Sequence, residues 1–147
     1  MKQALSIEQM KHLKELGLDT SDASMVLIAT DDDGCNLLWE DAEKAIKHHW
    51  YNVHFNLYYV DTSSHDHSLK EECGVFTLQD ILGKLPCFID THVLTLQKLA
   101  NSGTCLYMEP YSRSILNLTE SKELIDAAYE MLCWCIENGY VKVGKEE

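Results

Sequence analysis

The chain has 147 residues, which allows one domain or two very small ones. It carries 24 acidic and 12 basic residues, a formal net charge of −12, and Arg113 is its single arginine. Because binding to a phosphate backbone requires clustered Lys and Arg, we expect no direct nucleic-acid binding. No apolar run approaches the roughly 18 residues of a membrane span, and the N-terminal segment lacks the apolar core of a signal peptide. We therefore expect a cytoplasmic protein that does not enter a membrane.

A capped helix and a hairpin are predicted at the start of the chain. The Ser6-Ile7-Glu8-Gln9 pattern is typical of a capping box, and it predicts a helix to about Leu16 with Gly17 after its end. Met25 to Ala29 and Asn36 to Trp39 are short apolar runs on either side of an Asp-rich turn. Such runs predict a β-hairpin.

The middle of the chain predicts a strand and a long polar segment. Residues 51–60 alternate between apolar and polar side chains, which is typical of a half-buried strand. Residues 61–73 are polar and predict an exposed loop or a linker. Residues 41–47, between the hairpin and the strand, have a helix-forming composition.

The second half predicts a helix, three strands and a final helix. Thr77 begins a capping pattern, and Pro86 ends the short helix that follows it. The strands are expected over residues 92–99, 104–109 and 111–118. The final helix is expected over Ser121 to Asn138, with Thr119 or Ser121 as its N-cap and Gly139 after its end.

The final helix has a broad apolar stripe that another element must cover. Its apolar residues at helical spacing are Leu124, Ala127, Ala128, Met131, Leu132, Cys135 and Ile136. Three antiparallel strands with both helices on one face would bury this stripe, so we predict an α+β fold. The helix–three strands–helix order resembles the double-stranded-RNA-binding domain. RNA-binding members of that family have a basic start to the last helix, whereas residues 119–123 are mixed to acidic here.

We expect two parts, residues 1–75 and residues 76–147, as one compact domain or two closely packed units. The first part has 14 acidic and 6 basic residues. Each part has a capped helix followed by a hairpin, so an internal duplication is one interpretation. The simpler interpretation, which we favour, is that any two such units look alike.

Six cysteines are scattered along the chain, and they indicate reduced thiols buried as small apolar side chains. His65 and His67 form the best candidate for a metal site, because residues two apart in an extended loop point the same way. Cys73 or Glu72 would supply a third ligand. The spacing does not match known zinc motifs, so we expect a solvated polar loop and no metal.

The sequence contains none of the common catalytic or nucleotide-binding motifs, and we expect no catalytic residue, no cofactor and no enzymatic activity. Aromatic residues crowd the first half, and neighbouring rings on a strand point to opposite faces, so some of them should be exposed. The candidate contact residues are Trp50, Tyr51, Tyr58 and Trp134.

Three segments resemble small uncharacterised proteins from phages, prophages and mobile elements of gut bacteria. They are SIEQMKHLKELGLDTSDASM, FTLQDILGKLP and IDAAYEMLCWCIENGYVKVGK, together about half of the chain, while Asp41 to Glu72 departs most. The resemblance implies a cytoplasmic accessory protein. We therefore expect a protein that binds another protein, with a second copy of itself as one option. The alternative is an acidic mimic of nucleic acid that inhibits a host or phage-defence protein.

Overall fold

The computed structural model describes residues 2–31, 36–37, 55–61 and 74–144. The chain divides into two compact units: a discontinuous unit, Met1–Asp19 with Phe76–Glu147, and an inserted unit, Thr20–Val75. The N-terminal helix therefore folds with the second half of the chain, whereas the sequence placed it in a part spanning residues 1–75.

The inserted unit is a small antiparallel sheet built on β1 (Met25–Asp31). One edge of β1 pairs along its whole length with β3 (Phe55–Asp61). Its other edge pairs with β2 (Asn36–Leu37) and with β4 (Gly74–Val75). The pairing of β1 with β2 confirms the predicted hairpin. The helix predicted over residues 41–47 and most of the polar segment 61–73 lie outside the described residues.

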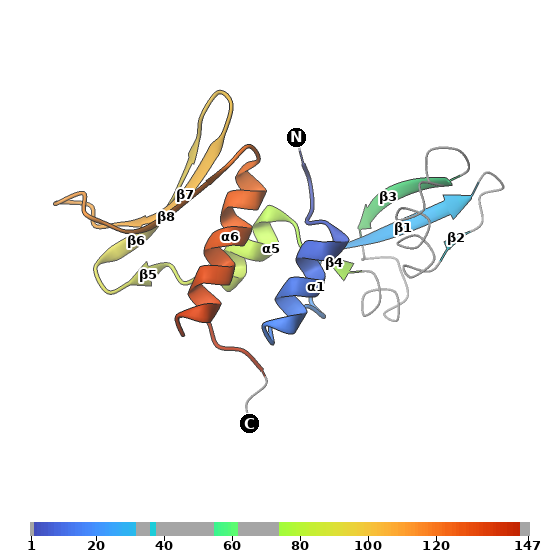
Figure 1. Ribbon diagram of the computed structural model, residues 1–147, viewed down its shortest axis with the longest axis horizontal. Helices are drawn as coiled ribbons and strands as arrows, with labels where there is room; N and C mark the ends of the chain where they lie inside the picture. Colours follow the sequence, from blue (N-terminus) through green and yellow to red (C-terminus); the bar gives the residue numbers. More distant parts are fainter. Residues whose placement is uncertain (1, 32–35, 38–54, 62–73, 145–147) are drawn as a thin grey trace. The chain divides into compact units, whose positions relative to one another are not determined.

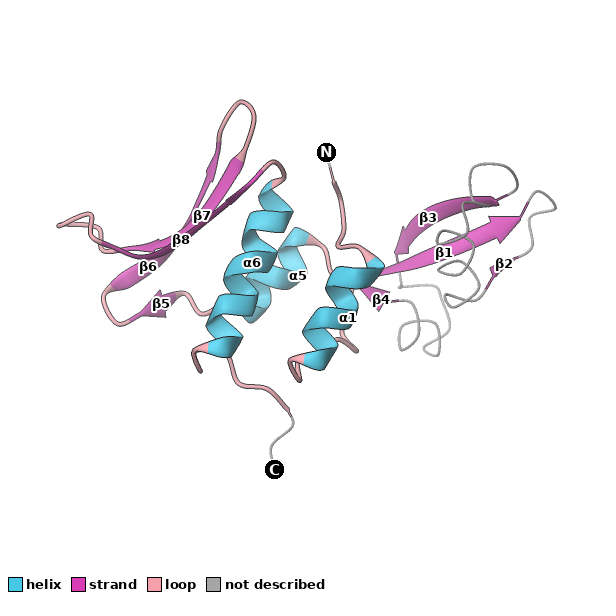
Figure 2. Cartoon of the chain, viewed as in Figure 1, coloured by secondary structure: helices cyan, strands magenta, loops and turns pink. Residues whose placement is uncertain are grey.

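The discontinuous unit has a four-stranded antiparallel sheet with helices on one face, which confirms the predicted α+β class (Figures 1 and 2). The sheet order is β5-β6-β7-β8, so β5 and β8 are its edges. The helices are α1 (Ile7–Glu15), α5 (Leu78–Lys84) and α6 (Leu124–Glu137). The strands are β5 (Phe88–Ile89), β6 (His92–Lys98), β7 (Gly103–Met108) and β8 (Ile115–Ser121). The two-residue strand β5 adds a fourth strand to the three that the sequence predicted.

Capping boxes fix the starts of the two short helices, as the sequence predicted. The Ser6 hydroxyl accepts a hydrogen bond from the Gln9 backbone N–H, and the Gln9 side chain accepts one from the Ser6 N–H. Thr77 and Asp80 make the same pair of bonds at the start of α5. After α1, Gly17 has a φ of 94°, a left-handed conformation that glycine adopts without strain.

The start of α6 differs from the prediction. The helix begins at Leu124 with Glu123 as its N-cap, and the Glu123 side chain makes no capping bond. Thr119 and Ser121, the predicted caps, belong to β8. The Thr119 hydroxyl donates instead to the Ala127 carbonyl at 2.6 Å, which ties β8 to the overlying helix. The predicted third strand was correspondingly too early, because residues 109–114 form the connection between β7 and β8.

The apolar stripe of α6 packs against β7, β8 and α5. The buried residues of the helix are Ile125, Ala127, Ala128, Met131, Leu132 and Cys135. Leu124 and Ile136 of the predicted stripe are half-buried, and Ile125 was not part of that prediction. Burying each of the larger side chains contributes roughly 1.5–3 kcal/mol. Gly103 at the start of β7 permits this contact, because a Cβ at that position would lie 2.7 Å from the Leu124 Cα. The close approach of strand and helix therefore requires glycine.

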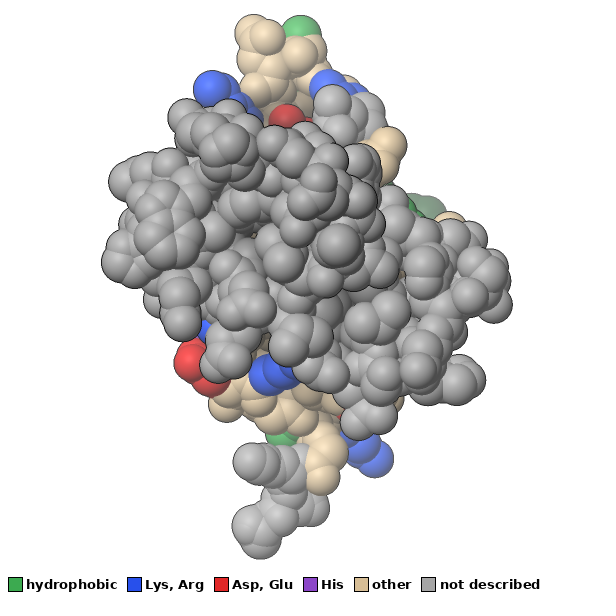
Figure 3. Space-filling model, turned by 90° about the vertical axis from the view of Figure 1, so that its right-hand side faces the viewer, with side chains coloured by type: hydrophobic (Ala, Val, Ile, Leu, Met, Phe, Trp, Pro, Cys, Tyr) green, Lys and Arg blue, Asp and Glu red, His purple; other side chains and the backbone are tan. Residues whose placement is uncertain are grey.

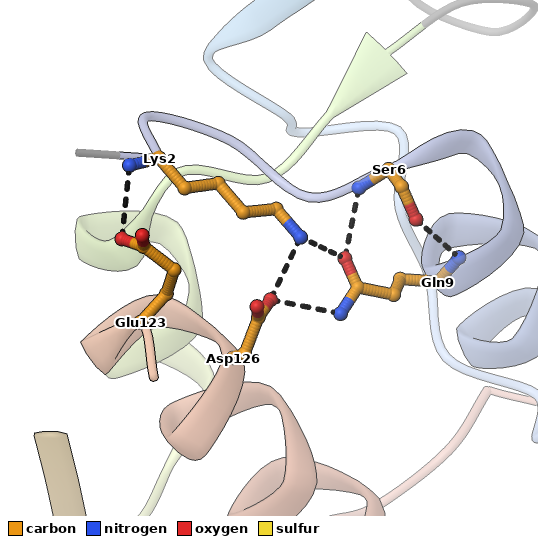
Figure 4. A network of polar contacts seen from close by, with 5 residues as sticks. All are labelled: Lys2, Ser6, Gln9, Glu123 and Asp126. Atoms are coloured by element: carbon orange, nitrogen blue, oxygen red, sulfur yellow. Dashed lines mark hydrogen bonds and ion pairs between the residues drawn. The ribbon is translucent and has the colours of Figure 1, made fainter. Parts of the chain in front are cut away.

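A polar network joins the N-terminal segment and α1 to α6 (Figure 4). The Lys2 ammonium donates to the Asp126 carboxylate at 2.8 Å and to the Gln9 side-chain oxygen at 2.9 Å. The Gln9 amide also donates to Asp126. The Lys2 backbone N–H donates to Glu123 at the helix start. These contacts explain why α1 belongs to the same unit as α6.

Candidate functional site

The sheet of the discontinuous unit has a covered face and a face on which no described helix lies (Figure 1). Side chains alternate between the two faces along each strand. Cys105 and Tyr107 of β7 are fully buried on the covered face, next to Cys135 of α6. Thr104, Leu106 and Met108 of β7 alternate with them and lie on the opposite face, which we call the open face.

Strand register sorts the open face into three rows, because directly paired residues share a face. The apolar row is Phe88, Val93, Met108 and Ile115. The middle row is Thr95, Leu106 and Leu118. The polar row is Gln97, Thr104 and Glu120. The open face thus changes from apolar to polar along the strand direction.

Large apolar side chains of the open face are exposed to solvent. The exposed fractions are 64% for Phe88, 50% for Ile115 and 46% for Leu118. Leu106 and Thr104, on the same face of the central strand β7, are almost fully buried. Several large apolar side chains exposed on one face mark interaction sites in soluble proteins more often than single scattered ones do.

A β-bulge puts Ile115 on this face. Asn117 and Thr119 face the helices, since they bond to Met131 and Ala127 of α6. Strict alternation would place Ile115 with them. The register shifts between Tyr107 and Met108, and Ile115 then pairs with Met108 on the open face. The bulge therefore adds a large apolar side chain to the edge of the surface.

The thiols of Cys105 and Cys135, on the covered face of the sheet, are unreactive at neutral pH. Burial, and to a smaller extent the neighbouring Cys135, raises the pKa of Cys105 to about 12. Burial also raises the pKa of Cys135 to about 11. Because the thiolate is the nucleophile, both side chains stay protonated and unreactive at neutral pH.

Of the predicted contact residues, Trp134 is the one whose side chain the structure describes. Trp134 lies on α6, in the helix layer, with its ring 5.4 Å from the ring of Tyr140. Tyr58 lies in β3 of the inserted unit, and its side chain is outside the description. Trp50 and Tyr51 also lie outside the described residues.

The metal candidates His65, His67 and Cys73, with Glu72, lie outside the described residues as well. Among the residues that are described, no group of three His, Cys, Asp or Glu side chains is placed to hold a metal ion. The same part of the chain contains no helix that combines the length and the apolarity needed to cross a membrane.

Charge is unequally divided between the units. The inserted unit has 11 acidic and 3 basic residues, whereas the rest of the chain has 13 acidic and 9 basic ones. In the face that Figure 3 shows, the described side chains in view include both basic and acidic groups.

Sequence reasoning missed Phe88, Ile115 and Leu118 as surface residues. The available signal was β7 itself, TCLYM, whose apolar side chains occupy both faces of the strand. One helix layer covers only one face of a sheet, so the edge strands keep exposed side chains on the other face. Comparison of the chain with protein-family models, with curated proteins and with solved structures finds no match.

Proposed function

We propose that this chain works without catalysis, by binding a protein through the open face, as an accessory protein of phage or mobile-element origin. The observation that carries the proposal is the solvent exposure of Phe88 and Ile115 at the two edges of the apolar row. Covering apolar surface releases roughly 25 cal/mol per Å². A partner that covers this row removes its apolar surface from water, and the free energy of that burial stabilises the complex.

The polar row supports the same function. Protein interfaces combine an apolar centre with a polar border. Gln97 and Glu120 are exposed at the polar end, and the Ser102 hydroxyl donates to Glu120 at 3.1 Å. The open face therefore has both parts of such a contact surface. The phage-protein resemblance of the sequence favours an accessory role over a metabolic one.

The test is capture of proteins from an extract of the native host with the full-length chain as bait. Leu118 on the open face is 46% exposed, and Tyr140, beside Trp134 in the helix layer, is 43% exposed. Leu118→Lys and Tyr140→Lys are therefore matched variants. We expect Leu118→Lys to lose the captured protein and Tyr140→Lys to keep it. Equal capture by both variants would remove the open face from the proposal.

The acidity of the inserted unit favours a second candidate, an inhibitor that mimics nucleic acid. Its net charge of −8, from 11 acidic and 3 basic residues, is concentrated in 56 residues of the chain. A mimic would bind a basic protein, and rising salt would weaken that binding steeply. Binding through the open face instead depends on apolar contact. A captured protein whose affinity is independent of salt would exclude mimicry.

A further inference from the structure

We propose that the partner of the open face is a second copy of this chain, stacked face to face on the first. This inference rests on the proposed function, because it names the occupant of the same surface. Stacking of two sheets through their uncovered faces, about 10 Å apart, is a standard way of burying an apolar sheet face.

The row pattern selects one symmetry axis. A two-fold axis parallel to the strands, between β6 and β7, keeps each row at its own level and sets the apolar row of one copy on that of the other. An in-plane axis perpendicular to the strands, placed through the middle row so that the two sheets overlap fully, would instead set the apolar row on the polar row. The parallel axis also places β5 over β8 of the second copy. Phe88 then meets Ile115 of the second copy, so the two most exposed large apolar side chains of the face cover each other.

The available area fits a dimer of modest affinity. The 22 strand residues of the sheet, at about 3.4 Å along a strand and about 4.8 Å between strands, give a planar footprint of about 360 Å². Projecting side chains make the accessible area larger than this footprint. Stable interfaces bury about 800 Å² per partner, and transient ones less than about 600 Å². We therefore expect a concentration-dependent dimer with a Kd in the micromolar range.

The charges on the open face do not oppose this arrangement. Gln97 and Thr104 are neutral, and Glu120 is the acidic residue of the three rows. Its two copies would lie at opposite edges of the stack, about three strand spacings or 14 Å apart. That separation exceeds the Debye length of about 8 Å at physiological salt. The net charge of −12 on each chain still repels at long range, so added salt should tighten the dimer.

The experiment is sedimentation velocity on the purified full-length chain over a range of concentrations and salt. We expect Phe88→Lys and Ile115→Glu each to raise the dimer Kd at least about tenfold, because each change buries two unpaired charges. Tyr140→Lys, a change in the helix layer, should leave the Kd unchanged. An equimolar mixture of Phe88→Lys and Ile115→Glu chains should recover dimer, since one Phe88–Ile115 contact then becomes a Lys–Glu pair and the other stays native. Far-UV circular dichroism checks folding, and Phe88→Ser replaces Phe88→Lys if the latter does not fold.

Several results would overturn the inference. A chain that stays monomeric at all concentrations excludes the second copy, and the proposed function survives if Leu118→Lys still loses a different captured protein. A dimer weakened by Ile115→Glu but not by Phe88→Lys indicates edge-to-edge pairing through β8. A mixture that recovers no dimer excludes the parallel axis. A dimer indifferent to every open-face variant places the contact elsewhere.

Discussion

The ammonium group of Lys2 lies 2.8 Å from the carboxylate of Asp126, although 124 residues separate them. The same carboxylate oxygen accepts a hydrogen bond from Gln9, which also completes the capping box of α1. One acidic side chain thus holds the N-terminal segment and the first turn of α1 against the first turn of α6 (Figure 4). The Lys2 and Asp126 side chains are only 27% and 22% exposed, so water screens the pair less than it screens a typical surface ion pair.

Lys2→Met and Asp126→Asn should each lower the free energy of unfolding by about 1 kcal/mol, because each removes one charge from a partly buried pair. The double variant should lose less than the sum, with a coupling energy of about 0.5–1 kcal/mol. Urea unfolding of the four chains measures this cycle. Glu15→Gln, which removes the more exposed His12–Glu15 pair, is the control and should change stability by less than about 0.5 kcal/mol. Strict additivity would show that the Lys2–Asp126 contact contributes nothing in solution.

Two glycine substitutions should change stability in opposite directions. Gly103→Ala places a Cβ 2.7 Å from the Leu124 Cα, which forces strand and helix apart and should cost about 1–3 kcal/mol. Gly83→Ala puts a methyl group into open space within α5 and should stabilise the protein by about 0.5–1 kcal/mol through helix propensity. Thermal unfolding of both variants gives the comparison. A neutral Gly103→Ala would contradict the close packing of β7 against α6.

Three of the four described cysteines should differ sharply in reactivity. Cys87 is exposed, whereas Cys105 and Cys135 are buried with pKa values raised by desolvation to about 12 and 11. At pH 7–8 a maleimide should label Cys87 within minutes and leave the other two unmodified until the chain unfolds. Peptide mapping by mass spectrometry distinguishes the sites, and the same reaction in denaturant is the control. Rapid native labelling of Cys105 would mean that α6 opens away from the sheet.

The connection between β7 and β8 should loosen at acidic pH. The Ser112 backbone N–H and hydroxyl, with the Tyr111 N–H, donate to the Glu109 carboxylate and hold its pKa below the usual value of 4.5. Because the folded pKa is lowered, the stabilisation is present above pH 4.5 and is lost as the pH falls through the folded pKa. Carboxyl-carbon NMR should give a Glu109 midpoint below 4.5, and Ser112→Ala should move it back towards that value. An unshifted midpoint in the native chain would exclude these bonds.

The elements that the sequence predicted well depend on neighbours within a few residues. The two capping boxes predict where their helices begin, because each capping bond joins residues only three positions apart: Ser6 with Gln9, and Thr77 with Asp80. The stripe of α6 is visible because helical spacing alone places its residues on one side. The predicted start of α6 failed since Thr119 and Ser121 are good caps locally, while pairing with Cys105 and Gly103 extends β8 through them.

The candidate surface was harder to predict, because its parts come from strands that are distant in sequence. Phe88 reaches the apolar row through β5, a two-residue strand too short to show a periodic pattern. Ile115 reaches it through a bulge, and a one-residue insertion reverses the face that alternation would assign. The sequence also could not predict which aromatic residues are exposed, since exposure depends on which surfaces the folded chain covers.

The sequence by itself determined the α+β class, the capped helices, the glycines that follow α1 and α6, and the apolar side of α6, because hydrogen bonds and side-chain spacing within one or two turns specify them. Tertiary structure decided that α1 folds with the second half of the chain, through Lys2 and Asp126, and that β7 meets α6 at Gly103. It also decided which side of the sheet remains uncovered. These outcomes depend on contacts between residues far apart in the chain. Such contacts contribute free energy only once the helices and strands have packed together.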